Sequence, residues 1–254
     1  MSYGSPQWQT WVLPEEDSIK HIKMAYDAGI NTFDTSNVYS NGQSEIVLGK
    51  AIKDLKLPRD EIVVMTKVFY TVARKMDSVM LPNPDQIGYV NQHGLSRKHI
   101  FESVKHSLKR LQLDYVDVLQ CHRFDPDTPI SETMQALHDV IKAGYVRYIG
   151  MSSCWAWQCV ERSTGNLING YSNDTGTKEI VDTVERIAKA RDISMAQVAL
   201  AWVISKEGVT APIIGSTSLD NLKDLIGAVD VKLTDQELKD LEAPYLVQRV
   251  FGHS

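Results

Sequence analysis

The fold of this chain is decided by residues 30–45, INTFDTSNVYSNGQSE. A short buried strand is predicted over 30–33, the chain turns polar at Asp34, and the loop that follows carries Tyr39. The loop closes with an Asn-Gly pair before a helical run that starts at Ser44. If this is one βα unit of a barrel, Asp34 and Tyr39 both point to the face where such enzymes keep their catalytic groups.

The composition is that of an ordinary globular protein with 254 residues, 43% of them hydrophobic, and a formal charge of −5. Mild acidity without a basic run gives no electrostatic case for binding nucleic acid. No apolar run approaches the ~20 residues of a membrane span, and the N-terminus lacks the apolar core of a signal peptide. The cysteines, Cys121, Cys154 and Cys159, form no CxxC pair. This cysteine pattern predicts a reducing, cytoplasmic setting. The charge and the lack of a long apolar run predict neither a nucleic-acid nor a membrane partner.

Apolar runs alternate with helical patterns along most of the chain, which predicts a parallel sheet with crossover helices. The predicted strands cover 30–33, 62–67, 115–122, 146–153 and 209–214. The predicted helices cover 18–28, 44–53, 97–111, 130–143, 178–191, 195–205, 219–228 and a last segment capped by Thr234. Five strands fall short of the eight that a closed (β/α)₈ barrel needs. The segment between Phe69 and Leu95 lacks periodicity, and it is either a loop that shapes the active site or an insertion without order.

Four polar side chains lie at or just after the ends of successive predicted strands: Asp34, Tyr39, Lys67 and His122. Each has an ordinary explanation when it is taken singly, as a turn acid, a packing ring, a solvated charge and a polar rim. The carboxyl ends of parallel strands meet at one edge of a sheet. Four such polar side chains at that one edge are unlikely to arise by accident. The four together therefore predict a catalytic site.

The four residue types suit proton delivery to a carbonyl oxygen. A phenol with a pKa near ~10 is a poor acid at neutral pH. A neighbouring lysine is expected to lower the pKa of Tyr39, while Asp34 holds that lysine in place. His122 can orient a carbonyl oxygen beside the phenol as hydride reaches the carbonyl carbon. No His or Cys spacing typical of a metal site is present, so no metal is predicted.

The residues around these four resemble the aldo-keto reductase family. Asn31 to Thr35 with Tyr39, Gly42, Ser44 and Glu45 is similar to the signature of that family, and 65–67 and 119–122 are similar to the strands that supply its lysine and histidine. The resemblance is closest to fungal aryl-alcohol dehydrogenase-like members and to potassium-channel β subunits. It implies a TIM barrel that binds NADP(H), with NAD(H) as an alternative, and Tyr39 as the general acid of a tetrad. The chain contains no GxGxxG or Walker sequence.

The resemblance also implies which residues contact the cofactor. Asp34 lies at the nicotinamide end, and Ser152 and Ser153 match the position that holds the nicotinamide carboxamide. A turn formed by Gly215, Ser216, Thr217 and Ser218 matches the loop that grips the adenosine phosphate, where helix N–H groups favour an anion. Asn221 falls where the family commonly has a Gln. Leu225 falls where an Asn is usual, and Ser218 falls where a basic residue would favour NADP over NAD.

The resemblance is interrupted in two places. The first barrel strand is mostly missing upstream of Tyr3, and a short polar loop stands between Gln158 and Lys178 where the family has its sixth and seventh strands. We therefore expect a single reductase domain over 1–254, built as an incomplete TIM barrel, with an internal deletion near 158–177. Three functions stay open: a reductase of aldehydes and ketones (or a dehydrogenase of aryl alcohols), a non-catalytic NADPH-binding regulatory subunit, and an inactive reductase fragment. The sequence does not indicate the oligomeric state.

Overall fold

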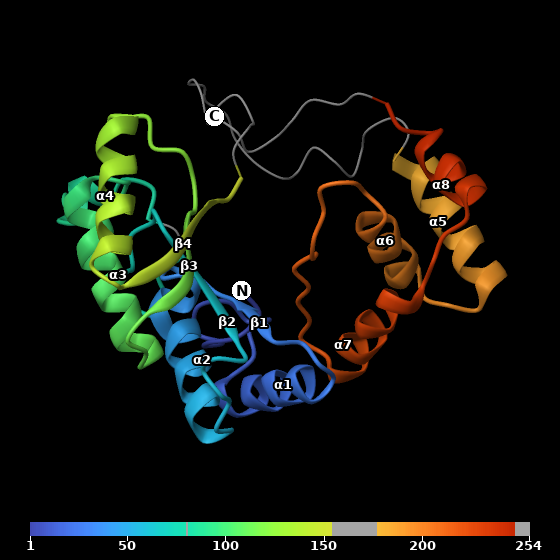
Figure 1. Cartoon of the computed structure of the whole chain (residues 1–254), viewed down its shortest axis with the longest axis horizontal. Helices are drawn as coiled ribbons and strands as arrows, with labels where there is room; N and C mark the ends of the chain where they lie inside the picture. Colours follow the sequence, from blue (N-terminus) through green and yellow to red (C-terminus); the bar gives the residue numbers. More distant parts are fainter. Residues whose placement is uncertain (80, 154–176, 247–254) are drawn as a thin grey trace. The chain divides into compact units, whose positions relative to one another are not determined.

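The structure is a computed structural model that describes residues 1–79, 81–153 and 177–246 (Figure 1). It divides into two compact units, residues 1–162 and 163–254, and each unit is described here by itself. The loop predicted to stand in place of two strands lies outside the described residues. The single domain over 1–254 and its deletion near 158–177 therefore stay predictions.

The first unit is built on a sheet of four parallel strands in the order β1-β2-β3-β4. The strands are β1 (Thr32–Asp34), β2 (Val63–Val68), β3 (Val116–Cys121) and β4 (Val146–Met151). Each pairs with the next in sequence, and a helix lies between them, as βα units require. The first four predicted strands are confirmed, and all their carboxyl ends lie at the same edge of the sheet.

The helices of the first unit are α1 (Glu15–Asp27), α2 (Gln43–Asp54), α3 (Arg97–Leu111) and α4 (Ile130–Lys142). Figure 1 shows α2, α3 and α4 side by side on one face of the sheet. The predicted caps explain where helices begin and end. Ser96 accepts a hydrogen bond from the N–H of His99 at the start of α3, and Gly29 and Gly144, both with positive φ, follow the ends of α1 and α4.

The core of the first unit lies between the sheet and these helices. Strand β2 is close to continuously apolar, as suits a strand covered on both faces. Val64 and Val68 on this strand are fully buried, and they belong to one cluster with residues from α2, α3, β3 and α4. Its other fully buried members include Val47, Ala51, Ile100, Leu111, Ala136 and Val140. Packing in this apolar layer holds in place the strand ends that carry the polar groups.

The second unit is helical in its described part. It contains α5 (Thr177–Arg191), α6 (Met195–Ile204), α7 (Leu219–Ile226), a 3₁₀ turn η4 (Gly227–Asp230) and α8 (Asp235–Glu242). Its small core joins α5, α6 and α8 through Ile187, Ala188, Val198 and Leu241. The cap predicted at Thr234 is confirmed as a capping box, in which Thr234 and Glu237 each accept a hydrogen bond from the other's backbone N–H.

The fifth predicted strand is wrong. Residues 209–214 adopt no regular secondary structure. A strand needs a neighbour to pair with, and the described part of the second unit contains no other strand. Pro212 also lacks the N–H that a ladder would use.

The four described strands do not close on themselves, so this parallel β/α sheet is that of an incomplete barrel. Within the described ranges, no helix is both long and apolar enough to cross a membrane.

Candidate active site

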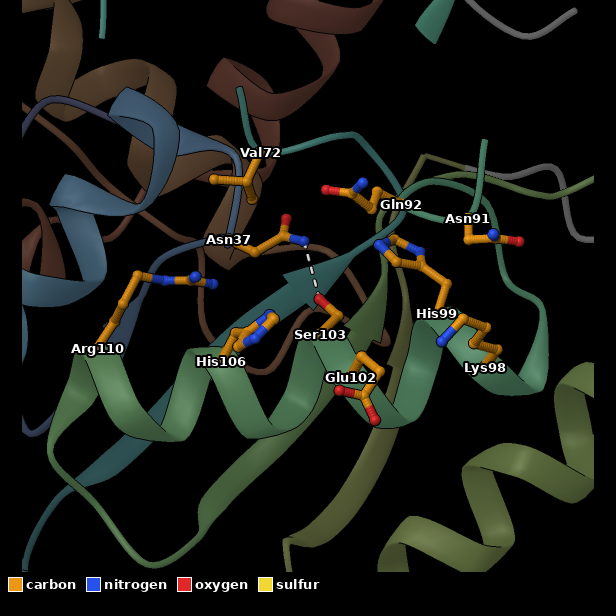
Figure 2. Close-up of a pocket in the computed structure, with 10 residues that line it drawn as sticks. All are labelled: Asn37, Val72, Asn91, Gln92, Lys98, His99, Glu102, Ser103, His106 and Arg110. Atoms are coloured by element: carbon orange, nitrogen blue, oxygen red, sulfur yellow. Dashed lines mark hydrogen bonds between the residues drawn. The ribbon is translucent and has the colours of Figure 1, made fainter. Parts of the chain in front are cut away.

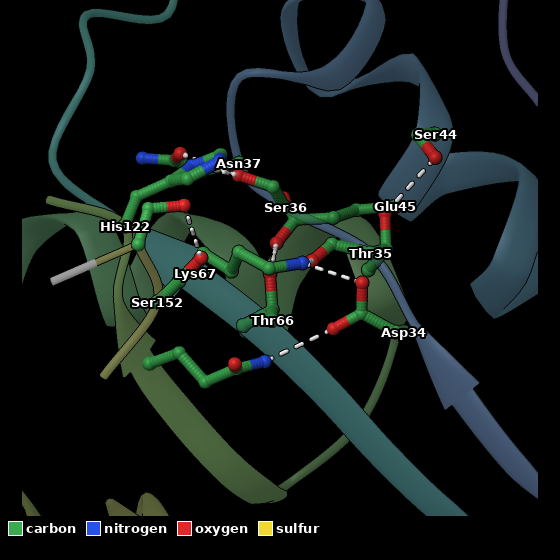
Figure 3. A network of polar contacts seen from close by, with 12 residues as sticks. Asp34, Thr35, Ser36, Asn37, Ser44, Glu45, Thr66, Lys67, His122 and Ser152 are labelled. Atoms are coloured by element: carbon green, nitrogen blue, oxygen red, sulfur yellow. Dashed lines mark hydrogen bonds and ion pairs between the residues drawn. The ribbon is translucent and has the colours of Figure 1, made fainter. Parts of the chain in front are cut away.

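A buried ion pair joins the ends of the first two strands. Lys67 Nζ on β2 donates to Asp34 Oδ2 on β1 at 2.5 Å and to the carbonyl oxygen of Thr35 at 2.9 Å (Figure 3). The exposed fractions of the two side chains are only 6% and 11%. Burial lowers the pKa of Lys67, and the charge of Asp34 acts in the opposite direction. The structure therefore brings Asp34 and Lys67 together as predicted.

Gln120 completes the surroundings of Asp34. Its Nε2 donates to Asp34 Oδ1 at 3.0 Å, so the carboxylate accepts a hydrogen bond on each oxygen. Gln120 is not among the site residues predicted from the sequence. Because side chains two apart on a strand share a face, Gln120 lies on the same face of β3 as His122 would. That spacing is the signal that could have identified it.

His122 stands at the end of β3 between two aromatic rings. The rings of Tyr39 and Tyr70 meet it edge to face, with centroid distances of 5.6 and 5.2 Å. Nδ1 of His122 lies 3.1 Å from Ser36 Oγ, which fixes the ring plane. Burial, followed by the charges of Lys67 and Arg123, lowers the pKa of His122 to about 3. At neutral pH this imidazole is therefore uncharged.

Tyr39 begins a 3₁₀ turn, η1 (Tyr39–Gly42), and is half-buried. The expectation that Lys67 lowers its pKa is wrong. Burial, followed by the charge of Asp34, raises the pKa of Tyr39 to about 12. The reason is geometric: Lys67 Nζ lies 5.0 Å from the ring centroid and gives its hydrogen bonds to Asp34 and Thr35. Tyr39 therefore stays protonated throughout the neutral range.

The turn after Tyr39 has an unusual backbone. Ser40, Asn41 and Gly42 all have positive φ, at 49°, 49° and 92°. Such strain persists only where the surroundings hold it, and the Asn41 side chain supplies that hold. Its Nδ2 donates to the carbonyls of Lys75, Met76 and Ser78, and its Oδ1 accepts from the N–H of Ala73.

These contacts attach the segment between Phe69 and Leu95 to the Tyr39 turn. The segment includes a 3₁₀ turn, η2 (Pro84–Ile87), and buries the ring of Tyr89. At its start, Tyr70 contacts His122 and accepts a hydrogen bond from Arg123 Nε at 3.1 Å. The described part of this segment is thus tied down beside the tetrad. That it shapes the substrate pocket stays a prediction.

A separate pocket of about 300 Å³ lies beside this loop, against α3 (Figure 2). Its lining is polar and includes His99, Ser103 and His106 of α3 together with Asn37. Asn37 Nδ2 donates to Ser103 Oγ at 3.0 Å across its floor. None of the four tetrad side chains lines it. The pocket therefore borders the loop that carries Tyr39 without containing the candidate catalytic groups.

The two serines expected at the nicotinamide lie directly after β4, at the edge that carries the tetrad. The N–H of Ser152 donates to the Cys121 carbonyl at 2.9 Å, which continues the β3–β4 ladder past the strand end. Ser152 is half-buried, Ser153 is exposed, and their hydroxyls lie 3.4 Å apart. Both hydroxyls can rotate to donate, so their chemistry fits the carboxamide oxygen of a nicotinamide.

The turn expected at the adenosine phosphate lies in the second unit. Ser218 Oγ caps α7 by accepting from the N–H of Asn221, and Ser216 Oγ accepts from the N–H of Ser218. Gly215 and Thr217 are exposed and keep their N–H groups available within the described residues. A hydroxyl-rich helix start with available N–H groups fits an anion.

Within the described ranges, no cluster of three His, Cys, Asp or Glu side chains could hold a metal ion. The groups that meet at the strand ends are instead a phenol, an ammonium, a neutral imidazole and a carboxylate. Comparison with known proteins identifies the family of this chain. The profile described as the aldo/keto reductase family matches residues 1–169 and 161–245, which is nearly the whole chain. The chain belongs to the aldo/keto reductase family.

Fungal relatives of this aldo/keto reductase agree with the family assignment. The aldo-keto reductase AFTS1 of Alternaria alternata is 36% identical, with 100% of this chain and 89% of the relative covered. The versiconal hemiacetal acetate reductase of Aspergillus parasiticus is 35% identical, with coverages of 98% and 93%. A Schizosaccharomyces pombe protein named as a candidate aryl-alcohol dehydrogenase is 34% identical, with coverages of 96% and 90%.

The alignment with the Alternaria protein spans 330 positions, whereas this chain has 254 residues. The alignment therefore opens gaps on the side of this aldo/keto reductase, which is consistent with a truncated member of the family. The resemblance to fungal aryl-alcohol dehydrogenase-like members is confirmed at the level of the family and of these relatives. The chain is accordingly an oxidoreductase of the aldo/keto reductase type.

Proposed function

We propose that this aldo/keto reductase reduces aldehydes or ketones to alcohols, or oxidises aryl alcohols in reverse, with NADP(H) and with Tyr39 as the general acid. NAD(H) is the alternative cofactor, because no basic residue stands at Ser218. The observation that carries the proposal is the Asp34–Lys67 ion pair beside the Tyr39–His122 ring contact. Relatives named as reductases and as an aryl-alcohol dehydrogenase support the same reaction class.

When it is bound, the reduced nicotinamide supplies a hydride to the carbonyl carbon. Reduction leaves an alkoxide, which is a stronger base than a phenolate whose conjugate acid has a pKa of about 12. Proton transfer from the Tyr39 hydroxyl to that alkoxide is therefore downhill, and it yields the alcohol and a phenolate. The charge of Arg123 opposes the rise in the Tyr39 pKa and therefore favours the phenolate.

The neutral His122 supplies orientation in this scheme. Its Nδ1 is engaged with Ser36, so the other ring nitrogen is directed away from Ser36. The tautomer protonated on Nε2 can donate to the carbonyl oxygen beside Tyr39. Because His122 has a pKa of about 3, it does not become a competing acid at neutral pH. Ser152 and Ser153 would hold the nicotinamide carboxamide, and the turn from Gly215 to Ser218 the adenosine phosphate.

The test is fluorescence quenching and oxidation of NADPH by the full chain with a panel of aromatic and aliphatic aldehydes. The expected result is NADPH binding with turnover, and Tyr39→Phe should lower kcat by about 10²- to 10⁴-fold without changing NADPH affinity, because it removes one proton donor. A parallel titration with NADH, and with Ser218→Ala, reports on cofactor preference.

Two other outcomes would replace the proposal. Tight NADPH binding without turnover, together with a co-purifying partner, would favour a regulatory subunit. Neither binding nor turnover would identify an inactive truncated chain, for which the open four-stranded sheet gives a structural reason. The cytoplasmic location and the small-molecule substrate are part of the same proposal.

A further inference from the structure

The residues adjacent to the tetrad in sequence form a buried polar layer on the helix side of the sheet. Thr35 follows Asp34, and its hydroxyl donates to Ser44 Oγ on α2 at 2.9 Å. Thr66 precedes Lys67, and its hydroxyl donates to Glu45 Oε1 at 2.6 Å. Figure 3 shows these contacts behind the Asp34–Lys67 pair. Two consecutive residues of α2 thus hold the neighbours of both members of the ion pair.

The carboxyl group of Glu45 lies in the protein interior, away from water. Its side chain has an exposed fraction of 0%, and its second oxygen, Oε2, accepts from Arg110 Nε on α3 at 2.6 Å. Gly42 leaves the room for this contact, because a Cβ there would lie 2.7 Å from Arg110 Cδ. A buried ion pair is a poor source of stability, since its desolvation offsets much of its attraction. Packing alone therefore gives little reason for this Glu–Arg pair.

The pair has a geometric consequence for the active site. Strand β1 is three residues long and pairs with three residues of β2, and beyond it the N–H groups of Thr35 and Asn37 donate to the carbonyls of Met65 and Lys67. These main-chain bonds set the register of the strands, whereas the side chain of Lys67 depends on what holds the strand from its two faces. Side chains of consecutive strand residues point to opposite faces, so a bond that fixes Thr66 on one face also fixes Lys67 on the other. The bond from Thr66 to Glu45 is the tie on that face.

We propose that Glu45, held by Arg110, is a positioning residue that sets the Lys67–Asp34 geometry through Thr66. This inference rests on the proposed function for its kinetic consequence, and on the ion pair alone for its structural one. None of the three residues touches the reacting groups. Arg110 lies on a helix outside the family-like stretch of residues 30–45, so the proposal extends the site to α3.

The test compares three variants in the full chain. Thr66→Val keeps the shape of the side chain and removes the hydroxyl, and Thr66→Ser restores a hydroxyl. Thr133→Val is the matched control, because Thr133 on α4 is also buried and donates its hydroxyl to the Leu95 carbonyl at 3.2 Å, away from the tetrad. The readouts are kcat and KM for an aldehyde, the melting temperature, and the pKa of Lys67 from ¹³Cε NMR.

The expected result is a loss in kcat of about ten- to a hundredfold for Thr66→Val, the cost of a small displacement of a catalytic group, with KM within about twofold. Thr66→Ser should recover most of that loss. Thr133→Val should lower the melting temperature comparably and leave kcat unchanged. The pKa of Lys67 should fall in Thr66→Val, because Asp34 then opposes the effect of burial less effectively. Equal kcat and equal Lys67 pKa in Thr66→Val and Thr133→Val would overturn the proposal.

Failure of this inference is distinguishable from failure of the proposed function. If the wild-type chain shows no turnover, the NMR comparison alone decides, because it requires only the folded protein and the ion pair. If Thr66→Val does not fold, the single variant Glu45→Gln replaces it, and Thr66→Ser is measured beside it. A Lys67 pKa that follows Thr66 and Glu45 but not Thr133 supports the positioning role, and one that follows none of them refutes it.

Discussion

The two units of this chain differ in how deeply their most buried ion pairs lie. In the first unit, Lys67 and Asp34 are nearly excluded from water, and Glu45 is completely buried. In the second unit, the ion pairs lie at the surface: Arg186 and Asp240 have exposed fractions of 59% and 31%. A buried pair costs desolvation and a surface pair costs little. The deeply buried charges of the described residues therefore lie at and next to the candidate site in the first unit, whereas surface pairs, which both units carry, give modest stabilisation.

The largest effect should come from breaking the buried pair. Lys67→Met leaves Asp34 buried with Gln120 as its remaining side-chain partner. We expect a loss of about 3–5 kcal/mol in the free energy of unfolding, the usual cost of an uncompensated buried charge. We also expect turnover to fall at least about a hundredfold, because the ion pair that holds the two strand ends beside Tyr39 and His122 is lost. Urea unfolding and NADPH oxidation measure the two effects.

A double variant separates these two effects. Asp34→Asn combined with Lys67→Met removes both charges, so stability should return toward the wild-type value while turnover stays low. If the double variant is as unstable as Lys67→Met, the uncompensated charge of Asp34 is not the cause.

An intermediate effect is expected from His122 as the pH falls. Its pKa is about 3 in the folded chain and 6.5 in an unperturbed histidine, so the unfolded state binds the proton more tightly. The stability that depends on the neutral imidazole is complete above pH 6.5 and is lost progressively toward pH 3. Urea midpoints at several pH values should show this loss in the wild type and a smaller one in His122→Gln. Parallel curves for both proteins would contradict the assignment.

The smallest effect should come from the surface of the second unit. Glu237→Gln removes the ion pair with Arg191 and keeps an amide that can complete the capping box. The hydrogen bond from Arg191 holds the pKa of Glu237 down at about 2, so its contribution is present above pH 4.5 and is lost toward pH 2. At neutral pH we expect the substitution to lower the free energy of unfolding by about 0.2–1 kcal/mol and to leave kcat unchanged. A change in kcat would contradict the contrast between the units.

Local patterns were sufficient to predict the parts of the fold that depend on local causes. Strand β2 and helix α3 are readable because an apolar run and a cap are properties of neighbouring residues. Residues 209–214 had the same local appearance and form no strand, since a ladder depends on a partner elsewhere in the chain. The tetrad was predictable because all its members end strands or follow them. Their roles stay predictions.

The electrostatics of the site were less predictable. The expected pKa of Tyr39 had the wrong direction, because burial of the phenol and the exact position of Lys67 are three-dimensional facts. Gln120 could have been identified by strand alternation. Arg110 could not, because nothing in the sequence of α3 indicates that one of its several basic side chains turns inward to Glu45.

Gly42 connects these observations in a way that matters for reading sequences. Its positive φ and the Arg110 side chain above it both disfavour a Cβ, so the residue is constrained by its own backbone and by a second helix. A glycine in a short family-like pattern can therefore be required in part by a side chain that is distant in sequence. Transplanting residues 30–45 into another barrel would carry over Tyr39 and Asp34, but the graft would lack the inward arginine for which Gly42 makes room.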